Sequence, residues 1–201
     1  MVRRPRRKAE ETKADILTAA EALLRKKGFA GFSIADLAAE LQMSPANVFK
    51  HFQSKTVLAD AICDRHTTRM IGRFDAKDDS VPAPARLGLV ARRLMDAHLA
   101  DIRDNPLFFE MLAMMASTDL PSGRHYRKLI EDLFESVVRH GFETGVYKSA
   151  PESTIGRSVA PCFAGVLHHV FLIHADEAEL HARCDGLVEL VNAALQSPLA
   201  K

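Results

Sequence analysis

Apolar residues recur at helical spacing along nearly the whole chain, and this periodicity restricts the fold more than any other feature. One stripe near the start consists of Ile16, Ala20, Leu23 and Leu24, and one near the end consists of Leu180, Cys184, Leu187, Val188, Val191 and Leu195. Residues three and four positions apart lie on one face of an α-helix. The period-two alternation of a strand is nearly absent, and aromatic residues make up only 6% of the chain. The sequence therefore predicts an all-α fold.

Residues that begin and end helices divide this periodic pattern into segments. The first third of the chain carries Gly28 as a stop, Ser33 with Asp36 and Ser44 with Pro45 as starts, and Ser54 as a further start. The segments between them are predicted helices over 34–41 and 45–52, with a longer helix from about 54. After the polar segment 75–84, we expect helices at roughly 84–103, 106–117, 122–145, 152–174 and 177–196, with a bend at Pro161.

The charge is distributed unevenly, although the formal net charge is only +1. Residues 1–55 hold 11 Lys/Arg and 6 Asp/Glu, whereas the remaining residues hold 16 and 20. A basic front on a mildly acidic body indicates a polyanionic partner for the front, although a solvated basic tail explains the same charge. The most basic part contains Arg3, Arg4, Arg6 and Arg7, and it is too polar to fold alone. We expect these arginines to follow the backbone or minor groove of DNA.

The two short helices at 34–41 and 45–52 are joined by only three residues, which is the helix-turn-helix arrangement. Leu37, Ala38 and Leu41 must pack against Val48 and Phe52, so the opposite face of the second helix points outward. That face, or its margin, carries Pro45, Ala46, Asn47, Phe49, Lys50 and His51. Asn pairs with adenine, Lys with guanine or phosphate, and small apolar groups contact thymine methyls. The pattern predicts that the second helix binds double-stranded DNA.

Residues 11–62 resemble the DNA-binding domain of the TetR family of bacterial transcription regulators. The resemblance rests on Gly28-Phe29, on Ile34-x-x-Leu37-Ala38 and on the run Val48-Phe-Lys-His-Phe-Gln-Ser-Lys55. It implies that Lys55 opens the fourth helix and contacts a phosphate, and Ser33 is a second candidate for a phosphate contact. The family usually has a tyrosine at Phe49, and phenylalanine lacks the hydroxyl that would reach the DNA backbone.

The resemblance also implies an all-helical homodimer with a divergent C-terminal domain that senses a small molecule. We therefore expect a flexible basic arm over 1–9, a helix-turn-helix domain over 10–62 and a ligand-binding and dimerisation domain over 63–201. Candidate dimer contacts are Phe163, Val166, Leu167, Val170, Leu187 and Val191. Candidate pocket residues, which could equally be core, are Leu94, His98, Phe108, Phe109, Met111, Leu112, Met114, Met115, Tyr126, Phe134, Tyr147 and His168. Their composition favours a largely apolar effector.

Several other classes of protein fit the sequence less well. A metal- or redox-responsive regulator could use His181, Cys184 or Cys162, although a cysteine in an apolar stripe is usually core. Motifs of common enzymes are missing, so we expect no catalytic activity and no cofactor; a helical adaptor remains an alternative. No apolar window approaches the roughly 18 residues of a membrane span, and the N-terminus lacks the apolar stretch of a secretory signal. We expect a cytoplasmic protein with no membrane partner.

Overall fold

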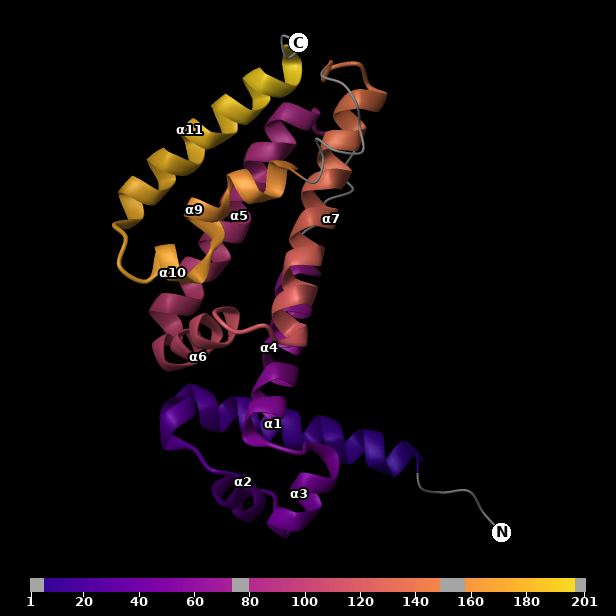
Figure 1. Ribbon diagram of the computed structural model, residues 1–201, viewed down its shortest axis with the longest axis vertical. Helices are drawn as coiled ribbons and strands as arrows, with labels where there is room; N and C mark the ends of the chain where they lie inside the picture. The colour runs from indigo at the N-terminus through magenta and orange to yellow at the C-terminus, as the bar shows by residue number, and fades with distance from the viewer. Residues whose placement is uncertain (1–5, 74–79, 149–157, 198–201) are drawn as a thin grey trace. The chain divides into compact units, whose positions relative to one another are not determined.

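Helices make up all the regular secondary structure of the described residues, as the periodicity predicted. The computed structural model describes residues 6–73, 80–148 and 158–197. The helices are α1 (Arg6–Gly31), α2 (Ile34–Glu40), α3 (Pro45–His51), α4 (Lys55–Ile71), α5 (Ala83–Asp104), α6 (Pro106–Ala116), α7 (Pro121–Glu143), α9 (Ala164–Leu167), α10 (His169–Leu172) and α11 (Glu177–Gln196), and residues 158–162 are also helical (Figure 1).

The chain folds into two compact units that do not follow its order. Unit 1 contains Met1–Thr67 and Asp104–Gly123, whereas unit 2 contains Thr68–Arg103 and Arg124–Lys201. Helix α6 therefore belongs to unit 1, although the helix before it and most of the helix after it belong to unit 2. The boundary near residue 67 falls inside α4, so a continuous helix joins the units there.

Unit 1 has an apolar core to which each of its first four helices contributes. Its fully buried side chains include Ile16, Ala20, Leu24, Leu37, Val48, Leu58 and Ile62. These are the positions that the helical stripes place on one face of each helix. The core holds α2 and α3 together beneath α1 (Figure 1).

A buried carboxylate ties α1 to α4 within unit 1. Glu21 is only 7% exposed and accepts hydrogen bonds from Arg25 at 2.9 Å and from Arg65 at 2.7 Å. Arg65 also donates to the carbonyl of Leu17 at 2.8 Å. A buried charge is tolerated when it is paired and hydrogen-bonded, and two guanidinium groups meet that need.

The same cluster reaches α6 through an aromatic ring. The Arg25 guanidinium lies 4.2 Å from the centre of the buried Phe108 ring, and the His66 ring meets that ring edge-on at 5.1 Å. At the end of the following loop, the backbone N–H of Ser122 donates to the Asp60 carboxylate at 3.1 Å. Helix α6 is thus joined to α1 and α4 by specific polar and aromatic contacts.

Unit 2 packs α5, α7 and α11 around a second core. The Phe134 and Phe163 rings stack at 4.9 Å, and both side chains are fully buried. Polar contacts join α5 to α11: Arg92 pairs with Asp185 at 2.7 Å, Arg103 pairs with Glu177 at 3.0 Å, and a ring nitrogen of His181 lies 3.0 Å from the Asp96 carboxylate. The Tyr147 ring fills the space where Gly141 has no side chain, and its hydroxyl donates to Asn192 at 2.7 Å.

The prediction of one bent helix over 152–174 is wrong for the residues described. Helical structure runs over 158–162, stops at Phe163, resumes as α9 and stops again at His168, whose backbone is extended at φ −82° and ψ 128°. The His168 ring accepts the backbone N–H of Val170 at 3.3 Å and so begins α10 as an N-cap. A side chain that supplies this cap competes with continuation of the preceding helix. Residues 152–157 lie outside the described part.

The start of α1 also differs from expectation, whereas the stop at Gly28 is confirmed. Helix α1 begins at Arg6, so residues 6–9 of the expected flexible arm have a helical backbone. Arg, Lys and Ala, which make up this segment, all have high helix propensity. Gly28 has φ 70° and ψ 172°, a conformation that ends the regular helix before one further turn.

The turn between α2 and α3 contains a left-handed residue that is not glycine. Gln42 has φ 52°. Its N–H donates to the Ala39 carbonyl at 3.1 Å, and the N–H of Met43 donates to the Ala38 carbonyl at 2.9 Å. These two bonds form a Schellman motif, in which glycine is the usual residue at the left-handed position.

We predict that Gln42→Gly raises the free energy of unfolding by about 0.5–1 kcal/mol. A residue with a Cβ costs about 1–2 kcal/mol in this left-handed conformation, and glycine avoids that cost. Part of the gain is offset because glycine loses more backbone entropy on folding. Urea denaturation of the full chain measures the change. Gln42→Ala is the matched control and should bring no gain. A glycine variant less stable than the parent would contradict the argument.

The contact between Arg25 and Phe108 predicts that these residues are energetically coupled. In a double-mutant cycle of Arg25→Gln and Phe108→Leu, we expect the unfolding free energies to be non-additive by about 0.5–2 kcal/mol, the range for a cation over a ring. Lys26→Gln combined with Phe108→Leu is the control, and this pair should be additive. Equal coupling in both cycles would contradict a direct contact.

Candidate nucleic-acid interface

Helices α2 and α3 are capped and packed as the sequence predicted. The Ser33 hydroxyl accepts the N–H of Asp36 at 3.1 Å, and the Asp36 carboxylate accepts the N–H of Ser33 at 3.0 Å. These bonds hold the pKa of the Asp36 carboxyl below its usual value, the hydroxyl contributing most. The Ser44 hydroxyl accepts the N–H of Asn47 at 3.3 Å and caps α3. Both caps fix where the two helices begin.

Buried residues on α3 determine which of its side chains face outward. Val48 and the C-cap Phe52 are buried in the unit 1 core. The predicted DNA-binding side chains lie on the rest of the surface: Pro45, Ala46, Phe49 and Lys50 are exposed, and Asn47 and His51 are half-buried. The structure thus brings the six residues together on one short helix with polar, basic and apolar groups side by side, the set needed to contact base edges.

Lys55 lies at the first position of α4, as expected, and two aromatic rings hold it there. Its ammonium is 4.4 Å from the centre of the Phe29 ring and 5.1 Å from that of Phe32. The Ser54 hydroxyl accepts the N–H of Val57 at 3.1 Å. A cation beside the positive end of a helix suits a phosphate group.

A second lysine near α3 was not identified from the sequence. The ammonium of Lys13, on α1, lies 5.5 Å from the centre of the Phe52 ring at the end of α3. Lys13 is separated from Phe52 by 39 positions in the chain, so no local pattern could reveal their proximity. Among the arginines of the predicted arm, Arg3 and Arg4 lie outside the described part. Arg6 and Arg7 are the first two residues of α1.

The candidate pocket residues are divided between the two units. Phe108, Phe109, Met111, Met114 and Met115 all lie on α6 and belong to unit 1, where Phe108 contacts Arg25 and His66. Leu94, His98, Tyr126, Phe134 and His168 belong to unit 2.

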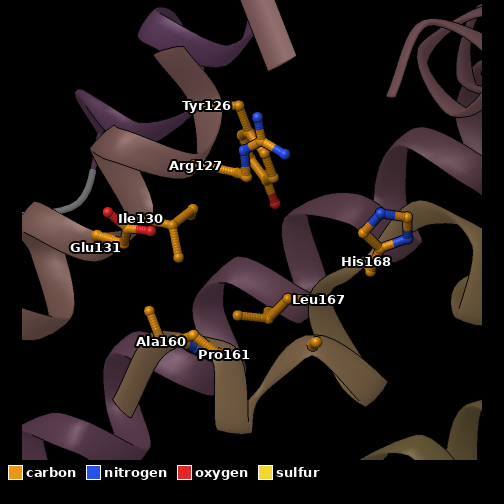
Figure 2. Close-up of a pocket in the computed structure, with 9 residues that line it drawn as sticks. Tyr126, Arg127, Ile130, Glu131, Ala160, Pro161, Leu167 and His168 are labelled. Atoms are coloured by element: carbon orange, nitrogen blue, oxygen red, sulfur yellow. The ribbon is translucent and has the colours of Figure 1, made fainter. Parts of the chain in front are cut away.

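Unit 2 contains a cavity of about 240 Å³ beside α7 (Figure 2). It is lined by Tyr126, Arg127, Ile130, Glu131, Ala160, Pro161, Ala164, Leu167 and His168. Only Tyr126 and His168 were among the candidate pocket residues. Of the others, Arg127, Ile130 and Glu131 lie on α7, and Ala160, Pro161, Ala164 and Leu167 lie around the break at 163, which the continuous helix expected there does not contain.

Tyr126 connects this cavity to a buried group of histidines. Its hydroxyl lies 2.8 Å from Nε2 of the fully buried His98, whose ring meets that of His169 edge-on at 4.8 Å. Burial raises the pKa of the Tyr126 hydroxyl, so the group stays protonated at neutral pH. The cavity therefore has one wall with hydrogen-bonding groups and an otherwise largely apolar lining.

The candidate dimer residues differ in accessibility. Phe163, Val166, Leu167 and Val191 are buried, and Leu187 is half-buried. On α10, Val170 and Phe171 are each 54% exposed, and on α11 Leu190 is 66% exposed. The exposed apolar side chains of α10 and α11 are the ones that a partner could reach.

Of the residues proposed for a metal or redox response, His181 is hydrogen-bonded, Cys184 is buried, and Cys162 is exposed with its thiol 3.3 Å from the Ser158 carbonyl. His181 places one ring nitrogen 2.7 Å from the Glu177 carbonyl and the other 3.0 Å from the Asp96 carboxylate. Burial raises the pKa of the Cys184 thiol to about 11, which disfavours the reactive thiolate. Within 6–73, 80–148 and 158–197, no three His, Cys, Asp or Glu residues come together as a metal site.

None of the helices in the described ranges is both long enough and apolar enough to cross a membrane.

Two family models match the chain at the positions of these features. One described as "Bacterial regulatory proteins, tetR family" matches residues 16–62, which contain α2 and α3. One described as "Tetracyclin repressor-like, C-terminal domain" matches residues 83–188, more than half of the chain.

Individual proteins similar to this chain are also transcriptional regulators. The chain is 34% identical over 83 residues to the HTH-type transcriptional regulator TtgR of Pseudomonas putida, a match covering 40% of each chain. The matched segment therefore spans less than half the length of that relative. The chain is also 21% identical over 202 residues to the uncharacterized HTH-type transcriptional regulator YerO of Bacillus subtilis, in a match that covers 94% of this chain and 68% of YerO. A crystal structure of a TetR-family regulator from Pectobacterium atrosepticum has the same fold, with a TM-score of 0.70, 18% identity and coverage of 98% and 99%.

The positions of Asn47 and Lys55 predict different effects on DNA binding. Asn47→Ala should reduce the discrimination between a preferred duplex and its single-base variants by about 1–3 kcal/mol at one position. Lys55→Ala should weaken binding to all duplexes about equally, because a phosphate contact carries no sequence information. Fluorescence anisotropy at fixed salt measures both, with the outward Lys26→Ala as control. The reverse pattern would contradict this division of roles.

Proposed function

The chain belongs to the TetR family of bacterial transcriptional regulators, and we propose that it is a repressor that binds an inverted-repeat operator as a homodimer and is released by a small ligand. Members of this family are non-enzymatic DNA-binding proteins with a ligand-responsive C-terminal domain. The observation that carries the proposal is the outward face of α3, where side chains suited to base edges lie beside the lysine that opens α4.

We infer that α3 enters the major groove and that flanking groups hold the phosphates. Pro45, Ala46, Asn47, Phe49, Lys50 and His51 would face base edges or the adjoining backbone. Lys55 and Ser33 would contact phosphates, and Arg3, Arg4, Arg6 and Arg7 would add charge beside them. The Phe49 ring, at 45% exposure, can contact a sugar or a thymine methyl in place of the missing hydroxyl bond.

Two copies would meet through the exposed apolar surface of α10 and α11. Val170, Phe171 and Leu190 supply side chains that are more than half exposed in the single chain. Burying such groups is favourable at roughly 25 cal/mol per Å². The largely buried candidates Phe163, Val166 and Leu167 would then support this surface from within. A dimer brings two copies of α3 to two half-sites, which one short helix cannot read alone.

The membership of α6 in unit 1 suggests how a ligand would act. Helix α6 is joined by the chain to α5 and α7 of unit 2, while Arg25 and Glu21 tie it to α1. A ligand that changes α5 or α7 would therefore displace α6 together with α2 and α3. A ligand preference of about 1–3 kcal/mol for one state is typical of such coupling. A bacterial regulator meets its operator DNA in the cytoplasm, so the protein would act there.

Selection of binding sites from a random duplex DNA pool, with the full chain at fixed physiological salt, tests this proposal. We expect an enriched inverted repeat whose half-site centres lie about 34–36 Å apart or at a multiple, since two symmetry-related α3 helices must enter successive major grooves. The enriched duplex should bind a dimer in analytical ultracentrifugation.

Salt-sensitive binding without an enriched motif would overturn the proposal, because it would mean that the basic front binds only phosphates. An enriched single half-site bound by one chain would overturn the dimeric part alone.

A further inference from the structure

We propose that the cavity of unit 2 binds a small carboxylate with an apolar body, its oxygens held by Tyr126, Arg127 and His168. This proposal rests on the function proposed above, since it names the chemical class of the effector. It commits to an anionic head group, whereas the composition of the sequence indicated only a largely apolar molecule.

The apolar part of the lining and the volume of the cavity indicate the size and polarity of the rest of the ligand. Ile130, Ala160 and Leu167 line the cavity together with Pro161 and Ala164 (Figure 2). Its volume of about 240 Å³ lies below the range of roughly 300–1,000 Å³ typical of sites for drug-sized molecules. An apolar cavity of about 150 Å³ holds benzene, so an aromatic ring with a short chain fits here.

The His168 ring offers the cavity an N–H group rather than a lone pair. Its Nδ1 accepts the backbone N–H of Val170 at 3.3 Å. A neutral histidine whose Nδ1 is an acceptor carries its proton on Nε2. In Figure 2 the other nitrogen of this ring points toward the side of the cavity where Tyr126 lies. A backbone bond thus fixes the tautomer that donates to an acceptor.

Tyr126 supplies a second donor from α7. His98 is fully buried, and its Nε2 lies 2.8 Å from the Tyr126 oxygen. With a carboxylate bound, His98 Nε2–H donates to the Tyr126 oxygen, and the Tyr126 hydroxyl donates to the ligand. His98 is therefore a positioning residue, which holds the phenol oxygen without touching the ligand.

The two charged residues of the lining orient the ligand. Arg127 follows Tyr126 on α7 and, among the residues that the structure describes, none pairs with its guanidinium. Glu131 lies one turn further along α7, on the side of the cavity away from His168 (Figure 2). A carboxylate is attracted to the end with Arg127 and repelled from the end with Glu131. Arg127 also provides the planar pair of donors that suits a carboxylate.

Isothermal titration calorimetry of the full chain with three matched probes tests the head group. The probes are 4-phenylbutyrate, 4-phenylbutan-1-ol and 4-phenylbutylamine, which share one apolar body. We expect the acid to bind at least ten-fold more tightly than the alcohol and the amine. Equal or tighter binding of either, or no binding of the acid, would overturn the proposal.

Variants of the lining locate the binding site. Tyr126→Phe and Arg127→Gln should each weaken the acid about five-fold or more and leave the alcohol unchanged. The matched controls are Tyr147→Phe, whose hydroxyl bonds Asn192 instead, and Lys128→Gln, which faces solvent. Because Arg127 is exposed, its variant tests the site even if Tyr126→Phe does not fold. Loss of acid binding in the controls to the same extent would overturn the assignment to this cavity.

The calorimetry needs no DNA, so the two proposals fail separately. Binding of the acid without any enriched duplex would support the carboxylate site and overturn the proposal of a repressor. An enriched duplex with no preference for the acid in calorimetry would support the repressor and overturn the proposal of a carboxylate site. When both stand, the acid should release the selected duplex, and Arg127→Gln should require a higher concentration of acid for that release.

Discussion

The buried carboxylate of Glu21 is the interaction on which the arrangement of unit 1 depends. It binds Arg25 on its own helix and Arg65 on α4, and Arg25 carries the contact on to Phe108 of α6. An unpaired charge at 7% exposure would be costly, so the three helices must keep their register for the carboxylate to remain satisfied. Helices from separate parts of the chain are therefore held as one body, with α2 and α3 attached to it.

As a result, the candidate pocket residues of α6 and the cavity lie in different units of the chain. Phe109 and Met111, which look like pocket residues, are buried in the unit that contains the helix-turn-helix. The cavity lies in unit 2 and is formed by α7 and the broken segment after 158. A ligand bound there would affect α3 through the chain segments that enter and leave α6 and through α4, which is continuous across the boundary.

Local signals predicted the ends of α2 and α3 and which side chains of α3 face outward, because capping and periodicity depend on residues a few positions apart. Ser33 and Ser44 cap α2 and α3, as the sequence indicated. The sequence did not reveal the break at His168, where one ring replaces a helical bond with a cap, nor the proximity of Lys13 to Phe52. The proximity of Lys13 to Phe52 depends on tertiary packing, and His168 at the break lines the cavity. The bases that α3 contacts and the residues of the dimer stay predictions.

Because α6 contacts α1 and α4 of unit 1, it should unfold with them and not with its neighbours in the chain. Native-state hydrogen exchange across a range of low denaturant concentrations measures this directly, since amides of one cooperative unit share one opening free energy. We predict that amides of α6, from about Phe109 to Met115, merge with those of α1 and α4, and that α5 and α11 form a separate group. Amides of α6 that merge with α5 and α11 instead would contradict the account.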